Sequence, residues 1–268
     1  MRINTNVSAL NARNNLRNAQ ADMEKAMERL SSGLRINGAS DDAAGLAISE
    51  RLEAQTRGME QAYANAQDGI SMIQTADGSM GVISDILQRA RELAVQADNG
   101  TYSDADKASI QNEIGQLLEE IDHIAQNSSF NGINLLADAK DVKLHVSEKA
   151  TDIITVSTVK SDSEGLGVDG IDVTADAQAA ITAIDGALDT LSEARAGLGA
   201  AQNRLDFISQ NLATTQTNTE ASNSQIADAD MAAEMSELTR AQTLQSTTMA
   251  MLTKANSQPQ QVQQLLQG

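Results

Sequence analysis

Three glycines in one short segment have the spacing that most directly suggests chemistry. Gly165, Gly167 and Gly170 match the pattern G-x-G-x-x-G. In dinucleotide-binding proteins this pattern follows a strand and opens a helix, so that backbone N–H groups approach a pyrophosphate. Here the preceding residues predict a β-hairpin and the next helix begins too late. We therefore interpret the segment as a flexible loop.

The other residues that could support catalysis or bind a metal are scattered. His123 falls in a predicted helix with no His or Cys at ligand spacing, and His145 alternates within a predicted strand. The acidic segment ADADMAAE lacks the glycine and spacing of a calcium loop and suits a helix N-terminus better. The chain has no cysteine. We expect no catalytic residues, no cofactor and no metal, and a protein that is not an enzyme.

The elements that carry these residues are long helices, as the composition indicates. Aromatic residues make up only 1% of the chain, and Pro259 is its one proline. A compact enzyme of this length would normally fill a thick core with aromatic side chains, whereas Ala, Leu, Ile, Val and Met suit thin seams between helices. No apolar run approaches the roughly 20 residues of a membrane span. We expect a soluble protein that does not bind membranes.

Charge is distributed unevenly along the chain. The net charge of −18 opposes binding to nucleic acid phosphates. Residues 1–21 contain three arginines and no acid, and residues 241–268 contain one lysine and no acid, so all 37 acids lie between them. We interpret the two ends as segments buried against something, and the acidic middle as facing water.

Heptad patterns predict three long helices in the middle of the chain. The first covers about 41–98, which corresponds to about 85 Å. Asn99-Gly100 ends it, and Ser103 with Asp106 caps a second helix that should run antiparallel to the first. A third covers about 176–223, where polar seam residues such as Arg195 and Ser209 would fix the register. The heptad stripe of the first helix is Ile48, Leu52, Gln55, Met59, Ala62, Ala66, Gly69, Ile73, Ala76, Met80, Ile83, Leu87, Ala90 and Ala94.

Between the second and third helices the pattern changes. DVKLHV and IITVSTV alternate apolar and polar residues, which predicts a β-hairpin within about 137–175. The two ends of the chain carry weaker apolar stripes surrounded by Asn, Thr, Ser and Gln. Neither end could offset its ordering entropy alone, so each end should pair with the other. The expected fold is mainly α, a coiled-coil-like bundle with a small hairpin and paired terminal helices.

Several long segments, in order, resemble bacterial flagellin. They are MRINTNVSALNARNNL, RLSSGLRINGASDDAAGLAISERL, DGISMIQTADG, LQRARELAVQADNGT, FNGINLL, GLGAAQNRLDFISQNLATT and IADADMAAEMSELTRAQTL. The resemblance covers about 1–136 and 176–268, without the large outer domains of many flagellins. It implies a structural subunit that polymerises into the extracellular bacterial filament used for motility. It also implies an export chaperone and a cap protein as partners.

The resemblance implies a division into domains and an assembly surface. Residues 1–40 and 226–268 would form the inner core domain, and 41–225 the rod-like bundle. The glycine-containing break at Ser31–Ser40 would connect the two layers, with Ser40 or Asp41 capping the helix that follows. The residues expected to assemble on the terminal helices are Ile3, Val7, Leu10, Leu238, Leu244, Met251 and Leu265.

In some family members the rod also binds toll-like receptor 5. The segment QRARELAV places Arg89 and Leu93 at the corresponding positions, with Glu113 on the neighbouring helix. These three residues could equally be contacts between subunits.

Three other functions stay open from the sequence. A hook–filament junction protein shares similar ends, although the dense family motifs in the bundle favour the filament subunit. A helical adaptor or chaperone would be a stable monomer with ordered termini. An enzyme within 137–175 would have about forty residues and no cluster of His and acids.

Overall fold

The computed structural model describes residues 6–149 and 152–267, with side chains through Gln258. Most of these residues are helical, as expected. The helices are α1 (Val7–Ser32), α2 (Ala43–Asp98), α3 (Asp104–Asn127), α4 (Ala177–Ala227) and α5 (Met231–Gln267). The strands are β1 (Ser129–Phe130), β2 (Ile133–Asn134), β3 (Asp141–His145) and β4 (Ile153–Ser157).

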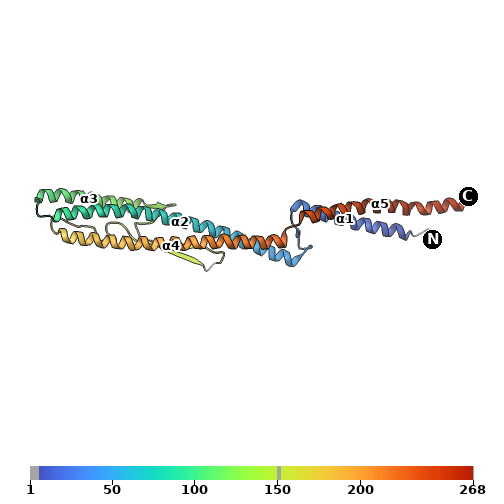
Figure 1. Cartoon of the computed structure of the whole chain (residues 1–268), viewed down its shortest axis with the longest axis horizontal. Helices are drawn as coiled ribbons and strands as arrows, with labels where there is room; N and C mark the ends of the chain where they lie inside the picture. The colour runs from blue at the N-terminus through green and yellow to red at the C-terminus, as the bar shows by residue number, and fades with distance from the viewer. Residues whose placement is uncertain (1–5, 150–151, 268) are drawn as a thin grey trace. The chain divides into compact units, whose positions relative to one another are not determined.

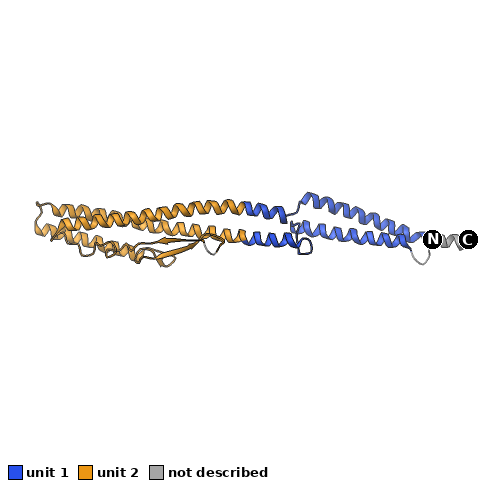
Figure 2. Ribbon diagram, turned by 90° about the horizontal axis from the view of Figure 1, so that it is seen from below, with its two compact units in different colours: residues 1–54, 218–268 blue, residues 55–217 orange. Residues whose placement is uncertain are grey.

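The chain folds as two compact units, coloured separately in Figure 2. Unit 1 comprises residues 1–54 and 218–268, and unit 2 comprises residues 55–217. Unit 1 combines the two ends of the chain, whereas unit 2 is one continuous segment. The domain division expected from the sequence, at residues 40/41 and 225/226, stays a prediction.

Unit 2 is a bundle in which α2, α3 and α4 lie side by side (Figure 1). The heptad seam expected on α2 is buried from Met59 to Ala94, so this prediction is confirmed for the bundle. On α4, large aliphatic residues seven apart face the same seam. They are Ile184, Leu191, Leu198, Leu205 and Leu212, all buried.

Polar residues in and beside this seam have partners on the opposite helix. Gln67 on α2 donates to the Ser209 hydroxyl on α4 at 3.2 Å. Arg195 on α4 donates through Nε to Asp77 at 2.7 Å, which raises the pKa of the guanidinium. Directional contacts of this kind favour one register of α2 against α4.

The start of α3 is fixed by a capping box. The Ser103 hydroxyl accepts from the Asp106 backbone N–H, while the Asp106 carboxylate accepts from the Ser103 backbone N–H. Hydrogen bonds from the Ser103 hydroxyl and then from its N–H lower the pKa of Asp106. Since α2 ends at Asp98, a short turn returns the chain as the sequence predicted.

The expected hairpin consists of β3 and β4, paired antiparallel with Lys143 opposite Thr155. Its inner face includes buried Ile154 and Val156, which belong to the bundle core. A second, shorter pair, β1 and β2, lies within a segment expected to be a turn-rich connection. Asn131 and Gly132 both have positive φ there, as a two-residue hairpin turn requires.

The glycine-rich segment is a loop between β4 and α4, as expected from its sequence. Gln111 on α3 holds the adjoining residues, since its amide donates to the Ile171 carbonyl at 2.8 Å and accepts from the Val173 N–H at 2.9 Å. Because α4 begins at Ala177, Gly170 does not open a helix. The arrangement lacks the strand–turn–helix context of a dinucleotide site.

Two glycines of α2 allow a matched test of the packing between the hairpin and the bundle. A Cβ at Gly69 would lie 2.5 Å from Leu144 Cδ1 and 3.2 Å from Leu205 Cδ1, whereas a Cβ at Gly78 would meet nothing within 4 Å. We predict that Gly69→Ala destabilises unit 2 by about 1–3 kcal/mol through overpacking. Gly78→Ala should stabilise it by about 0.5–1 kcal/mol through helix propensity. Thermal unfolding followed by circular dichroism measures both, and a higher melting temperature for Gly69→Ala would contradict the packing described.

Candidate functional site

The terminal helices α1 and α5 pair antiparallel within unit 1, and Figure 1 shows them side by side. At one end, Asn6 caps α1 by accepting from the Ala9 N–H, and its amide donates to the Ala255 carbonyl on α5 at 2.7 Å. At the other end, Arg29 on α1 forms an ion pair with Glu234 on α5 at 3.1 Å. The pairing of the two chain ends, expected from the sequence, is confirmed.

The seam between α1 and α5 is made of alanine. Ala12, Ala19 and Ala26 are the buried residues of α1, and they are spaced seven residues apart. Ala241 and Ala255 are buried on α5. Helices with small residues at the contact can approach closely, but each methyl group removes little apolar surface from water.

The larger apolar residues of this pair remain mostly exposed. Val7 and Leu10 on α1 and Leu244 and Met251 on α5 are exposed, while Leu238 is half-buried. Ile3 and the side chain of Leu265 lie outside the described residues. Other exposed large side chains on the two helices are Met27, Met231, Met235 and Met249. Unit 1 thus presents apolar surface that its own chain does not cover.

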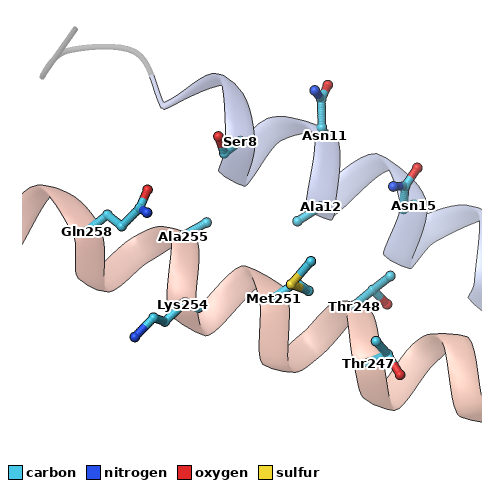
Figure 3. A pocket seen from close by; sticks show the side chains of 10 residues that line it. All are labelled: Ser8, Asn11, Ala12, Asn15, Thr247, Thr248, Met251, Lys254, Ala255 and Gln258. Carbon is cyan, nitrogen blue, oxygen red and sulfur yellow. The ribbon is translucent and has the colours of Figure 1, made fainter. Parts of the chain in front are cut away.

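A groove of about 490 Å³ opens between α1 and α5 towards the chain ends (Figure 3). Ala12 on α1 and Met251 and Ala255 on α5 point towards the opposite helix, whereas Asn11 points away. The Met251 side chain is at the groove yet 63% exposed, so it does not fill the gap.

Threonines on α5 satisfy their hydroxyl donors within the helix. Thr239, Thr243 and Thr247 each donate to the carbonyl four residues earlier, at 2.8–2.9 Å. Thr248 and Thr253 make the same contact. The hydroxyl donors of these threonines are therefore paired without help from another helix.

The break near the N-terminus is a short connector between α1 and α2. Gly33 ends α1 with φ 74°, and its N–H donates to the Arg29 carbonyl at 2.8 Å. The cap of α2 is Asp42, which accepts from the N–H groups of Ala44 and Gly45 at 3.0 and 2.9 Å. The prediction that Ser40 or Asp41 caps α2 is therefore wrong. Asp41 instead accepts from the Asn37 N–H.

The three residues of the possible receptor surface differ in exposure. Arg89 donates to Glu113 at 3.0 Å and to Glu92 at 3.2 Å, and these contacts raise the pKa of Arg89. The Arg89 and Glu113 side chains are 53% and 49% exposed. Leu93 is 3% exposed and belongs to the bundle core. Only Arg89 and Glu113 reach the surface of the free chain.

The scattered residues that could bind metals remain apart. His123 lies on α3, 3.9 Å from Glu120, and His145 lies on the exposed face of β3. Across residues 6–149 and 152–267, no group of three or more His, Cys, Asp or Glu could hold a metal ion. In the same part of the chain, no helix is both long and apolar enough to cross a membrane.

Sequence reasoning missed most of the seam of unit 1. It favoured larger residues on α1, such as Val7 and Leu10, but the buried positions are alanines. The period of seven in Ala12, Ala19 and Ala26 was the available signal. The hydrogen bonds between residues 33–35, which follow α1, and residues 227–229, which precede α5, join backbone groups. A side-chain pattern cannot reveal them.

Comparison with known proteins gives consistent matches. The family model of the bacterial flagellin N-terminal helical region matches residues 3–141, and that of the C-terminal helical region matches residues 181–266. The chain is similar to flagellin of Halalkalibacterium halodurans, with 48% identity covering 99% of this chain and 100% of that protein. Flagellin of Bacillus subtilis is 44% identical, with the same coverage of both chains.

Two solved structures are also similar. The crystal structure of Bacillus cereus flagellin has a TM-score of 0.51 at 36% identity, covering 60% of this chain and 94% of that chain. A putative flagellar hook-associated protein from Vibrio parahaemolyticus has a TM-score of 0.60 at 13% identity, covering 70% of this chain and 100% of that chain. At that identity the second likeness concerns the fold alone.

Substitution by alanine should affect stability differently at the three positions, because Arg89 and Glu113 are exposed and Leu93 is buried. Arg89→Ala and Glu113→Ala should each leave the free energy of unfolding nearly unchanged, because exposed ion pairs contribute little. Leu93→Ala should cost about 2–5 kcal/mol, since it leaves a cavity in the core. Urea unfolding of the three variants checks this. A neutral Leu93→Ala would mean that the side chain does not pack in the bundle.

Proposed function

The chain belongs to the bacterial flagellin family, and we propose that it polymerises through the outer surface of the paired helices α1 and α5. As a flagellin it is a non-enzymatic structural subunit of the extracellular flagellar filament that drives motility. The proposed division assigns residues 1–40 and 226–268 to assembly, and residues 41–225 to the rod.

The observation that carries this proposal is the exposed apolar surface of unit 1. The alanine seam joins α1 to α5, but Val7, Leu10, Leu244 and Met251 remain accessible to solvent. Further copies of the chain can bury these side chains, and contacts between different surfaces of identical subunits build helical polymers when they do not close. Low charge also favours the ends for dense packing, because residues 1–21 and 241–268 contain no acids. We propose the same role for Ile3, Leu238 and Leu265.

The family membership and the length of the matches favour a filament subunit over a hook–filament junction protein. The flagellin relatives match along their full length at 48% and 44% identity. The hook-associated structure shares the fold at 13% identity, which carries no argument about function.

The first test is seeded polymerisation. Purified full-length chain should extend short filament fragments into long filaments seen by electron microscopy. A chain lacking residues 1–30 and 231–268 should stay monomeric while its bundle remains folded, because it lacks the proposed assembly surface. If the full-length chain stays monomeric and its ends resist protease, a junction or adaptor role becomes the better explanation.

A point substitution in the same assay tests whether filament growth requires the packed seam between α1 and α5, and not only the presence of both chain ends. Ala19→Leu places a larger side chain in the buried seam, where overpacking typically costs about 1–3 kcal/mol. It should slow filament growth more than Ala21→Leu, since Ala21 is exposed on the same helix. Equal growth of both variants would count against a requirement for the seam.

For specific partners we propose those that the family resemblance implies. They are an export chaperone, a cap protein and, through Arg89 and Glu113, toll-like receptor 5. Arg89→Ala should preserve the bundle but reduce receptor binding by about tenfold if its charge-assisted contacts are used. Surface plasmon resonance with the receptor ectodomain measures this. Unchanged binding would leave Arg89 and Glu113 as inter-subunit contacts only.

A further inference from the structure

The connector between α1 and α2 is hydrogen-bonded to the connector between α4 and α5. The Arg35 N–H donates to the Ala227 carbonyl at 2.7 Å, and the Ala229 N–H donates to the Gly33 carbonyl at 2.9 Å. These bonds place Leu34 and Asp228 opposite each other in an isolated antiparallel bridge. The residue that follows α1 is thus fixed beside the segment that precedes α5.

The Arg35 side chain extends this contact to the end of α4. Its Nη2 donates to the carbonyls of Ile226 and Gln225, in the last turn of that helix. The last carbonyls of a helix have no partner within the helix and carry partial negative charge. A guanidinium at this position satisfies these acceptors and is favoured electrostatically, so Arg35 holds the first connector against the end of α4.

The same connector is also fixed to the start of α2. Ile36 is buried, and a Cβ on Gly45 would lie only 2.7 Å from Ile36 Cδ1. Oδ2 of Asp42, the residue that caps α2, would lie 2.5 Å from the same Cβ. The connector is therefore attached on one side to α2 and on the other to α4, rather than being a free loop.

The alanine seam specifies its own register poorly. Ala12, Ala19 and Ala26 repeat every seven residues, so a slip of α1 by one heptad places alanine again at two of the three positions. Seams of larger or polar residues resist such a slip because each position has a distinct partner. The register of α1 against α5 therefore depends on contacts other than those between alanines. These are the Asn6–Ala255 hydrogen bond, the Arg29–Glu234 ion pair and the backbone contacts between the two connectors.

We infer that the bridge between residues 33–35 and 227–229, together with the Arg35 side chain, sets the register of α1 against α5. We call this set of contacts the joint. The joint holds the end of α1 within hydrogen-bond distance of the residues that precede α5. Pairing then starts from a short closed loop, which lowers its entropic cost, and Arg29 meets Glu234 next to it.

The role of the joint in assembly rests on the proposed function, and filament growth tests it. Arg35→Ala should slow seeded growth about tenfold, as expected when charge-assisted hydrogen bonds that hold two segments together are lost. The melting temperature of the bundle should not change, because Arg35 is exposed and belongs to unit 1. Arg51→Ala removes a charge from an exposed position on α2 and should grow like the unmodified chain.

A disulfide can replace the lost contact, because the chain has no cysteine of its own. Leu34→Cys and Asp228→Cys introduce thiols at exposed, directly opposed positions of the bridge. In the Arg35→Ala background the oxidised pair should restore growth to within about twofold, and reduction with dithiothreitol should abolish the rescue. Wild-type growth of Arg35→Ala, or no rescue by the verified disulfide, would overturn the inference.

Register can be read without any polymer. Ala12→Cys with Met251→Cys reports the observed register, since both residues point across the groove in Figure 3. Ala12→Cys with Leu244→Cys reports a slip of one heptad. Arg35→Ala should shift disulfide formation from the first pair to the second. An unchanged ratio would overturn the inference, while failure of the unmodified chain to extend seeds would count only against the proposed function.

Discussion

The structure of unit 1 depends on the close approach of two helices through alanine. Ala12, Ala19 and Ala26 on α1 and Ala241 and Ala255 on α5 allow the backbones to come together but bury little apolar surface. The bundle in unit 2 solves the same packing problem with Ile, Leu and Met at heptad positions, and these larger side chains form a core of their own. One chain therefore contains a segment that folds on its own contacts and a segment whose apolar surface is left for other copies.

Charge follows the same division. Unit 2 carries 25 acidic and 10 basic side chains, whereas unit 1 carries 12 and 9. The acids of the bundle lie mostly on its surface, where water and salt screen their repulsion. Acids and bases nearly balance in unit 1, so copies packed densely there meet little net repulsion. Composition thus separates a solvated rod from a segment suited to burial, and both properties fit a filament subunit.

The sequence predicted the parts of the fold that depend on side-chain periodicity. The α2 seam, the Ser103 cap and the β3–β4 hairpin follow from heptads, capping residues and alternation, because each pattern reports which side is buried. The α1 seam was harder to predict, because alanine contributes little to any hydrophobic pattern and larger residues such as Val7 and Leu10 dominate that pattern. The joint could not be predicted, since Gly33, Ala227 and Ala229 contribute backbone groups. The burial of Leu93 shows that a motif taken from a family resemblance does not distinguish surface residues from core residues.

The hydrogen bonds of the α5 threonines lower the free-energy cost of removing water from that helix. Thr239, Thr243 and Thr247 already donate to carbonyls of their own helix, so the surrounding water does not have to accept these protons. Removing that water leaves no unpaired hydroxyl donor, and the desolvation penalty is correspondingly small. Covering these threonines with a neighbouring copy therefore costs less than the hydroxyl content of α5 indicates.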